Sequence, residues 1–148
     1  VGGDRQADRA GGAELRGHEV ILHLTVRGIP RTKKNSGRIV PRGAGHIMLP
    51  SEAWSAWCAL VAPQLQAAMQ GAGLAPIERP MNCRAVFYRE ADRGDAVGFY
   101  QGLADVLEHG GVVANDRWIV SWDGSRLSKD KHNPRVELTL TDTESESC

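Results

Sequence analysis

Alternating hydrophobic and polar positions predict three strands along this chain, over residues 18–26, 81–89 and 135–141. The first run is rich in β-branched residues, which suit a half-buried pleated surface. Each run has a set of positions expected to face inward: Val20, Leu22, Leu24 and Val26 in the first, Cys83, Ala85 and Phe87 in the second, and Val136, Leu138 and Leu140 in the third.

Apolar residues at helical spacing predict a helix capped by Ser51. Its apolar stripe consists of Trp54, Trp57, Cys58, Val61 and Leu65. Pro63 removes a backbone hydrogen bond, so we expect a kink near Ala59 or a break before a second short helix that ends near residue 70. Two tryptophans on such a stripe are most simply core residues, although nucleic-acid-binding proteins also stack bases on exposed indoles.

A second helical pattern follows Gly94 and carries glycine on one face. The apolar side of this predicted helix consists of Ala96, Phe99, Tyr100, Leu103 and Leu107. The helix is expected to end at Gly110-Gly111. Gly98 and Gly102 share the other face with Asp95 and Asp105, and each glycine costs ~1 kcal/mol relative to alanine in a helix. Some group must therefore approach this face closely. The spacing favours packing of a sheet, a second helix or a twin subunit over access of a bulky substrate.

Turn residues connect these segments and complete the predicted architecture. Residues 38–40 and 46–49 predict a short hairpin, and residues 117–122 predict a strand that Asp123-Gly124 turns into another hairpin. Residues 1–17 show no periodicity and predict a loosely ordered leader, and residues 142–148 form an acidic tail. The order of elements predicts one α+β domain over residues 18–141, with a mixed sheet flanked by helices.

Composition adds limits to this picture. The 148 residues fit one domain, and 18 basic against 18 acidic side chains provide no overall charge that would attract a polyanion. The cysteines, Cys58, Cys83 and Cys148, are odd in number and have no paired spacing, which is typical of a reducing compartment. Without an apolar run of ~18 residues or a charged-then-apolar leader, we expect a cytoplasmic protein that does not cross a membrane.

The distribution of charge is more informative than its sum. No acid lies between Glu19 and Glu52, and the basic residues of that stretch are Arg27, Arg31, Lys33, Lys34, Arg38 and Arg42. Their local positive field suits a polyanion such as nucleic acid, while the simpler interpretation is a basic loop that is only solvated.

Carboxylates concentrate between residues 90 and 123. Asp95 lies where the second helix begins, so it is either an N-cap or an oxygen ligand for a magnesium-type cation. Asp116 lies between a loop and a strand, so it is either a turn residue or a second ligand of the same ion. Asp105, in mid-helix, faces solvent or binds a neighbouring basic group. In phosphodiester cleavage a cation activates water and neutralises charge on the phosphate, and two carboxylates alone hold it weakly.

The run DAVGFYQGLADVLEHGGVVAND, from Asp95 to Asp116, resembles the signature of RusA-type Holliday-junction resolvases. In that family an Asp-x-Asp-Asn segment opens a helix, a lysine and an aspartate-leucine pair follow, and a glycine turn leads to an acidic pair before a strand. The spacing from Asp95 through Asp105 to Asp116 matches without a gap. The basic loop at residues 28–35 and the strand that begins at residues 134–137 are also similar, so the resemblance covers roughly residues 20–141.

The chain departs from this signature at three positions. The second aspartate of the motif falls on Val97, its asparagine on Gly98 and its catalytic lysine on Gln101. The resemblance therefore carries over Asp95 and Asp116 as metal ligands and catalytic residues. Asp92 is the nearby acid that would substitute for the missing ligand, while Gln101 can donate a hydrogen bond but brings no positive charge.

The resemblance implies a homodimer that acts on branched DNA, such as Holliday junctions, in recombination and repair, in a phage or in a host. It implies a structure-selective endonuclease that uses Mg²⁺ or Mn²⁺ and no small-molecule cofactor. The residues expected to contact DNA are Arg31, Lys33, Lys34, Asn35, Arg93 and Gln101. One alternative is a RusA-fold module that binds branched DNA or a protein partner without cleaving. Another is a small domain whose glycine face packs against a partner protein, with no nucleic acid involved.

Overall fold

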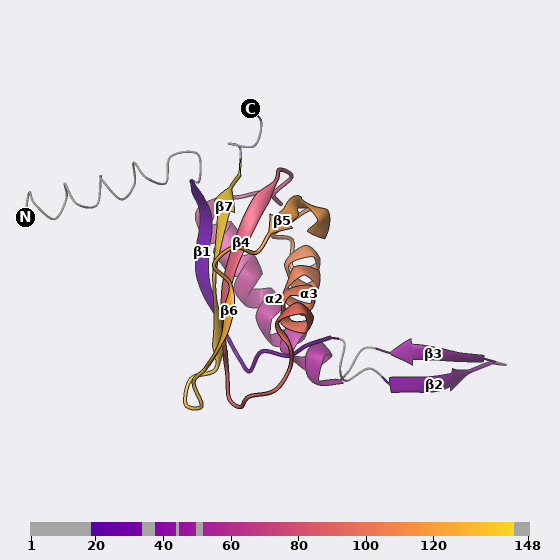
Figure 1. Ribbon diagram of the computed structural model, residues 1–148. Coiled ribbons are helices and arrows are strands. Elements are labelled where there is room, and N and C mark those ends of the chain that lie inside the picture. Colours follow the sequence, from indigo (N-terminus) through magenta and orange to yellow (C-terminus); the bar gives the residue numbers. More distant parts are fainter. Residues whose placement is uncertain (1–18, 34–37, 44, 50–51, 144–148) are drawn as a thin grey trace, which may run out of the picture.

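The structure is a computed structural model that describes residues 19–33, 38–43, 45–49 and 52–143. In chain order its elements are β1 (Val20–Arg27), β2 (Arg38–Arg42), β3 (Gly45–Leu49), α2 (Glu52–Ala72), β4 (Met81–Arg89), α3 (Ala96–His109), the 3₁₀ turn η2 (Asp116–Trp118), β5 (Ile119–Ser121), β6 (Arg126–Lys129) and β7 (Arg135–Asp142) (Figure 1). The three strands predicted over residues 18–26, 81–89 and 135–141 and both predicted helices are therefore present at nearly the expected positions.

One mixed sheet holds five of these strands, in the order β1-β7-β4-β5, with β6 also paired to β4. Strand β7 is antiparallel to both β1 and β4, whereas β5 and β6 run parallel to β4. A parallel neighbour requires a crossover connection, and α3 provides it between β4 and β5. This arrangement confirms the predicted α+β class with a mixed sheet.

Helices α2 and α3 lie on the same side of the sheet, as Figure 1 shows. Alternation along the strands turns one set of side chains toward these helices, and the apolar faces of the helices cover them. The largest side chains that are fully buried there are Phe87, Leu65, Met81, Leu103, Leu107, Leu138 and Leu140. This core fixes the position of α3, and therefore of the carboxylates that α3 carries.

Helix α2 is continuous for 21 residues and includes Pro63, so of the two predicted outcomes, a kink or a break, the break is wrong. Pro63 is exposed, while Val61 and Leu65 on either side of it are fully buried. Burying each such side chain contributes about 1.5–3 kcal/mol, which offsets the cost of about 3 kcal/mol for proline inside a helix. Trp54 and Trp57 are buried, which confirms that they are core residues. The predicted cap, Ser51, lies outside the described residues.

The region after α3 also differs from the prediction. Residues 116–118 form a 3₁₀ turn capped by Asn115, and the strand begins only at Ile119. Strands β5 and β6 each pair in parallel with β4, so Asp123-Gly124 does not reverse the chain into a hairpin. It shifts the chain along the edge of β4 instead. The side chain of Asn82 holds this turn, because its Oδ1 accepts a hydrogen bond from the Asp123 N–H at 2.7 Å.

The other predicted hairpin is present as a separate two-stranded sheet. Strands β2 and β3 are antiparallel and project away from the helices and the main sheet (Figure 1). Strand β7 extends to Asp142, one residue into the stretch predicted as a tail. Residues 1–18 and 144–148 lie outside the described part. Among the helices that are described, none has the length and apolar character needed to cross a membrane.

Candidate nucleic-acid interface

Asp95 caps the start of α3. Its Oδ1 accepts a hydrogen bond from the backbone N–H of Gly98 at 3.0 Å, and its own backbone is extended. The N-cap interpretation is therefore confirmed. The residue as a whole is exposed to solvent.

The segment that follows β1, residues 28–33, is called the basic segment below, and it runs across the glycine face of α3. A Cβ atom added at Gly98 would lie 3.1 Å from Thr32 Cγ2. One added at Gly102 would lie 3.2 Å from the backbone oxygen of Arg31 and 3.1 Å from Trp54 Nε1. Glycine therefore allows the basic segment and α2 to approach the helix this closely. Packing, which the spacing favoured, accounts for both glycines.

Gly102→Ala is expected to lower the free energy of unfolding by about 1 kcal/mol. Overpacking against the Arg31 carbonyl and Trp54 costs about 1–3 kcal/mol, more than the ~1 kcal/mol that alanine gains in helix propensity. The matched control is Gly71→Ala in α2, where a Cβ atom would meet nothing within 4 Å. This control is expected to be stabilising. Urea unfolding measures both, and equal stabilities for the two variants would contradict the close approach.

Lys33 reaches across α3 and binds Asp105. Its Nζ lies 2.8 Å from Asp105 Oδ2 and 5.0 Å from the centroid of the Trp54 ring. Both charged groups are partly exposed, so the ion pair itself contributes little stability. It nevertheless fixes where the basic segment lies. Of the two interpretations of Asp105, binding of a neighbouring basic group is therefore confirmed. The ammonium group of Lys33 is paired within the protein.

Cys58 lies near this ion pair, and its thiol is less acidic than an ordinary one. The pKa of Cys58 is raised to about 11, chiefly by burial of the thiol and further by the negative charge of Asp105. The positive charge of Lys33 lowers this pKa and offsets part of the rise. Because the thiolate is the reactive form, alkylation of the folded protein should be slow near about pH 8 and accelerate toward about pH 11.

Asp105→Asn removes one cause of the raised pKa, so it should shift the acceleration of Cys58 alkylation to lower pH. Mass spectrometry of the peptide that contains Cys58, after iodoacetamide treatment at several pH values, measures the effect. Alkylation of folded protein as fast as that of a free cysteine near neutral pH would contradict this expectation.

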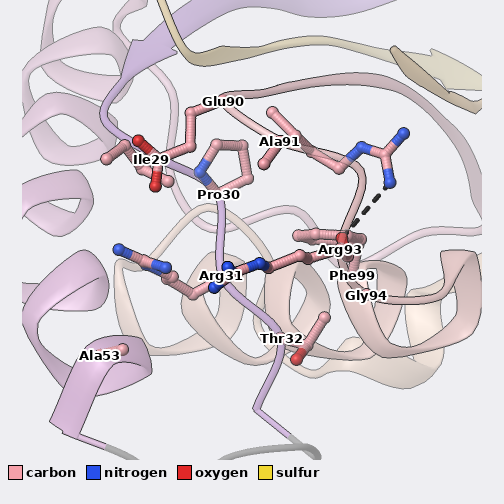
Figure 2. Close-up of a pocket in the computed structure, with 11 residues that line it drawn as sticks. Ile29, Pro30, Arg31, Thr32, Ala53, Glu90, Ala91, Arg93, Gly94 and Phe99 are labelled. Carbon is pink, nitrogen blue, oxygen red and sulfur yellow. Dashed lines mark hydrogen bonds between the residues drawn. The ribbon is translucent and has the colours of Figure 1, made fainter. Parts of the chain in front are cut away.

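A cavity of about 280 Å³ lies beside the start of α3, between the basic segment and the turn that follows β4 (Figure 2). Its charged lining consists of Arg31, Arg89, Glu90 and Arg93. Gly94, which directly precedes the N-cap, also lines it. The cavity therefore adjoins the end of α3 where Asp95 lies.

The three arginines of this cavity differ in their partners. The guanidinium group of Arg89 donates hydrogen bonds to two backbone carbonyls, that of Ser128 at 3.0 Å and that of Arg93 at 3.3 Å. The bond to the Arg93 carbonyl is the dashed line in Figure 2. Arg89 Nη2 also lies 3.5 Å from Asp92 Oδ1. Within the described residues, the guanidinium groups of Arg31 and Arg93 have no ion-pair or hydrogen-bond partner. These two cations are therefore available to bind an anion.

Asp92 is engaged with cations of the protein. Its Oδ1 lies 3.5 Å from Arg89 Nη2, and its Oδ2 lies 3.9 Å from Lys129 Nζ. The expectation that Asp92 would replace a missing metal ligand therefore gains no support from its contacts.

Asp116 lies toward the other end of α3 from Asp95. Its backbone N–H donates to Glu108 Oε1 at 2.8 Å, and Glu108 belongs to the last turn of the helix. Helix α3 has 14 residues, which makes it about 20 Å long at 1.5 Å per residue. Within one chain, the structure does not bring Asp95 and Asp116 to a single cation.

The remaining predicted residues lie on the surface or outside the described part. Val97 and Gln101 are exposed on α3, and Val97 has 63% of its surface accessible. Lys34 and Asn35 lie outside the described residues. In the ranges that the structure describes, no group of three or more His, Cys, Asp or Glu side chains is arranged to hold a metal ion.

Arg89 and Ala53 are parts of the site that the amino-acid sequence does not indicate. Both line the cavity, one from the end of β4 and the other from the first turn of α2. No local pattern marks them, because only the packing of β4 and α2 around the basic segment brings them together.

The fold and the site define an α+β protein with an arginine-lined cavity beside a helix capped by an exposed aspartate. A scan of the chain against protein-family models finds no match, and a search among curated proteins finds no significant match. The resemblance to RusA-type proteins thus rests on the residues and spacing of the chain itself.

Proposed function

We propose that this protein is a RusA-type, structure-selective endonuclease of weakened activity that acts on branched DNA such as Holliday junctions, with Mg²⁺ or Mn²⁺. The observation that supports this proposal is the position of the basic segment. Thr32 packs against Gly98, and the carboxylate of Asp95 caps the same turn of α3. The cavity lined by Arg31 and Arg93 adjoins the start of α3, so a phosphate bound there would lie on the same side of the molecule as the exposed Asp95.

Asp95 suits a cation that the substrate helps to hold. Mg²⁺ is commonly bound through one or two carboxylates together with substrate phosphates. The bound ion would neutralise charge on the scissile phosphate. The chain itself contributes the cations Arg31 and Arg93, which hold the phosphates of the DNA in position. Weak activity follows because Val97 and Gln101 bring neither a carboxylate nor a positive charge.

The proposal includes a homodimer. Most symmetric oligomers are twofold dimers, and a twofold axis suits the near-symmetry of a four-way junction. Contacts to phosphates from both subunits would read the shape of the branch and not its sequence.

A second candidate is a RusA-type module that binds branched DNA without cleaving it. The positions of Asp116 and Asp92 favour it, because the first lies toward the far end of α3 and the second is paired with Arg89 and Lys129. Both candidates use the same arginine cavity, and they differ in whether the DNA is cut.

Binding of a labelled four-way junction and of a linear duplex of the same sequences tests the shared part of the proposal. The junction should bind more tightly, and Arg31→Ala or Arg93→Ala should weaken binding. A plot of the logarithm of the association constant against the logarithm of salt concentration has a negative slope. Each substitution should make this slope less steep by about one for every phosphate that the variant no longer neutralises. Arg126→Ala, which changes an exposed arginine of β6 outside the cavity, is the control. Equal affinity for junction and duplex would contradict branch recognition.

Nicking of the same junction decides between the two candidates. The wild-type protein is expected to nick slowly with Mg²⁺ or Mn²⁺ and not at all with EDTA. Tight, metal-independent binding without nicking would reject the endonuclease and support the binding module.

A further inference from the structure

The hairpin formed by β2 and β3 stands apart from the main domain. Its two strands pair with each other and with no other strand of the described chain, and the ribbon projects away from the helices and the main sheet (Figure 1). A two-stranded hairpin alone is marginally stable in water and needs packing against another element. The hairpin therefore indicates a partner that this single chain does not supply.

The hairpin combines apolar residues with positive charge. Ile39 is the register partner of Met48, and the next residue, Val40, is the register partner of Ile47. Successive residues of a strand belong to opposite faces, so each face of the ribbon has one of these apolar pairs. Residues 38–49 also include two arginines and no acid. The ribbon suits an apolar surface that is not basic.

Helix α2 has such a surface, a row of exposed residues without charge. This row, the α2 row, consists of Ala53, Ala56, Leu60, Pro63 and Ala67. The exposed side of a helix normally carries polar and charged residues, and alternating spacings of three and four residues are those of a face that packs against another element. The α2 row therefore has the pattern of a covered face, although the described part of this chain leaves it exposed.

The α2 row also borders an open, mainly apolar depression of about 210 Å³. The depression lies between α2 and the basic segment, and its lining is Ile29, Arg31, Ala53, Ala56, Trp57 and Leu60. Leu60 is 53% exposed, and it lies against the start of the basic segment, since a Cβ atom added at Gly28 would be 2.5 Å from Leu60 Cδ2. An exposed leucine beside an apolar hollow is typical of a surface that receives a partner.

We propose that the hairpin of one protomer packs on the α2 row of a second copy of this chain, which returns the same contact about a twofold axis. Each copy has one hairpin and one α2 row, so this isologous arrangement covers both surfaces in both copies. The inference rests on the proposed function, because it supplies an interface for the homodimer included there.

Charge and coverage favour this contact over two other ways of joining two copies. Packing of hairpin on hairpin would bring the arginines of both ribbons together, and like charges repel. Packing of α2 row on α2 row would leave both hairpins uncovered. Helix α2, in contrast, contains no basic residue, and its one charged residue is the acid Glu52. The cation beside the contact is Arg31, which also lines the arginine cavity, where a DNA phosphate would neutralise it.

Sedimentation equilibrium of the full chain without DNA tests the interface. The wild-type protein is expected to be a dimer at micromolar concentration. Leu60→Arg should raise the dissociation constant of the dimer by more than about 100-fold, because the lost burial of leucine counts twice in a twofold dimer. The matched control is Gln66→Arg, which adds the same charge at an exposed residue of α2 outside the α2 row and should leave the dimer unchanged. Circular dichroism checks that both variants fold.

A mixture of two deficient chains identifies the surfaces that meet. One chain has a Gly-Ser linker in place of residues 38–49, and the other carries Leu60→Arg. Each alone should be monomeric at concentrations where the wild type is a dimer. Mixed together, they should form a heterodimer weaker than the wild-type dimer, because one intact hairpin still meets one intact α2 row. Packing of hairpin on hairpin, or of α2 row on α2 row, would give no such heterodimer.

Four results would overturn the inference. These are a wild-type protein that stays monomeric at about 100 μM, unchanged dimerisation of Leu60→Arg, a chain without the hairpin that dimerises as tightly as the wild type, and a mixture that forms no heterodimer. Failure of the proposed function has a different signature, since the dimer would persist while the protein bound junction and duplex alike. Preferred junction binding by a protein that shows any of the four results would reject only this interface.

Discussion

Asp95→Asn is expected to abolish metal-dependent nicking of a four-way junction while the fold and the binding of DNA persist. Asparagine is as good an N-cap as aspartate, so the side-chain oxygen can still accept from the Gly98 N–H and α3 still begins at the same residue. The negative charge that would hold the cation is removed. Charge stabilisation by a bound metal amounts to several kcal/mol, so the rate should fall by more than about 100-fold.

The matched control is Asp116→Asn, which makes the same chemical change toward the other end of α3. The backbone N–H of Asp116 donates a hydrogen bond to Glu108, and this bond does not need the carboxylate. We therefore expect nicking close to that of the wild type. Single-turnover nicking of an end-labelled junction, with binding measured in EDTA, tests both variants. Unchanged nicking by Asp95→Asn would remove the cleavage proposal, and equal loss in both variants would contradict the separation of the two carboxylates.

Val97→Asp combined with Gln101→Lys is expected to raise metal-dependent nicking by at least about tenfold, because it adds a carboxylate ligand and a cation for the phosphate. Both positions are exposed on α3, so the substitutions need no repacking. An acid in the first turn also suits the positive end of the helix dipole. The two new charges are four residues apart on the helix, where opposite charges attract.

Val120→Asp is the control for this gain, because Val120 is an exposed valine of β5, with 57% of its surface accessible. It adds the same charge away from the start of α3 and should not change nicking. If wild-type protein does not nick and the double variant does, the non-cleaving module becomes the better description. A double variant that binds junctions and gains no nicking would show that more than these two side chains is missing.

Much of the fold could be predicted because its elements have clear local periods. Strands β1, β4 and β7 follow alternation of period two, and α3 lies between the Asp95 cap and the Gly110-Gly111 turn. The close approach to Gly98 and Gly102 was also predictable, because glycine inside a helix needs a physical reason. The identity of the approaching groups was not.

Two local signals were overridden by interactions between distant residues. Pro63 predicted a kink or a break in α2, yet burial of Val61 and Leu65 keeps the helix continuous. Asp123-Gly124 has the composition of a hairpin turn, yet hydrogen bonds to Asn82 and the parallel pairing of β6 with β4 carry the chain onward. At Asp123-Gly124 the deciding partner is a hydrogen-bonded side chain of β4 that lies outside the local pattern. At Pro63 the deciding effect is the burial of Val61 and Leu65 in the core, which depends on residues distant in the sequence.

The sequence by itself determined which elements form, that Asp95 caps a helix and that the residues around Lys33 are basic, because these depend on neighbours along the chain. Only the tertiary structure decided which charges remain available. Lys33 pairs with Asp105 and Asp92 pairs with Arg89, while the guanidinium group of Arg31 has no partner in the described part of the chain. Asp95 caps the start of α3, whereas Asp116 lies in the turn beyond its other end. Charges interact through distance in space, and the packing of β1, α2 and α3 sets that distance.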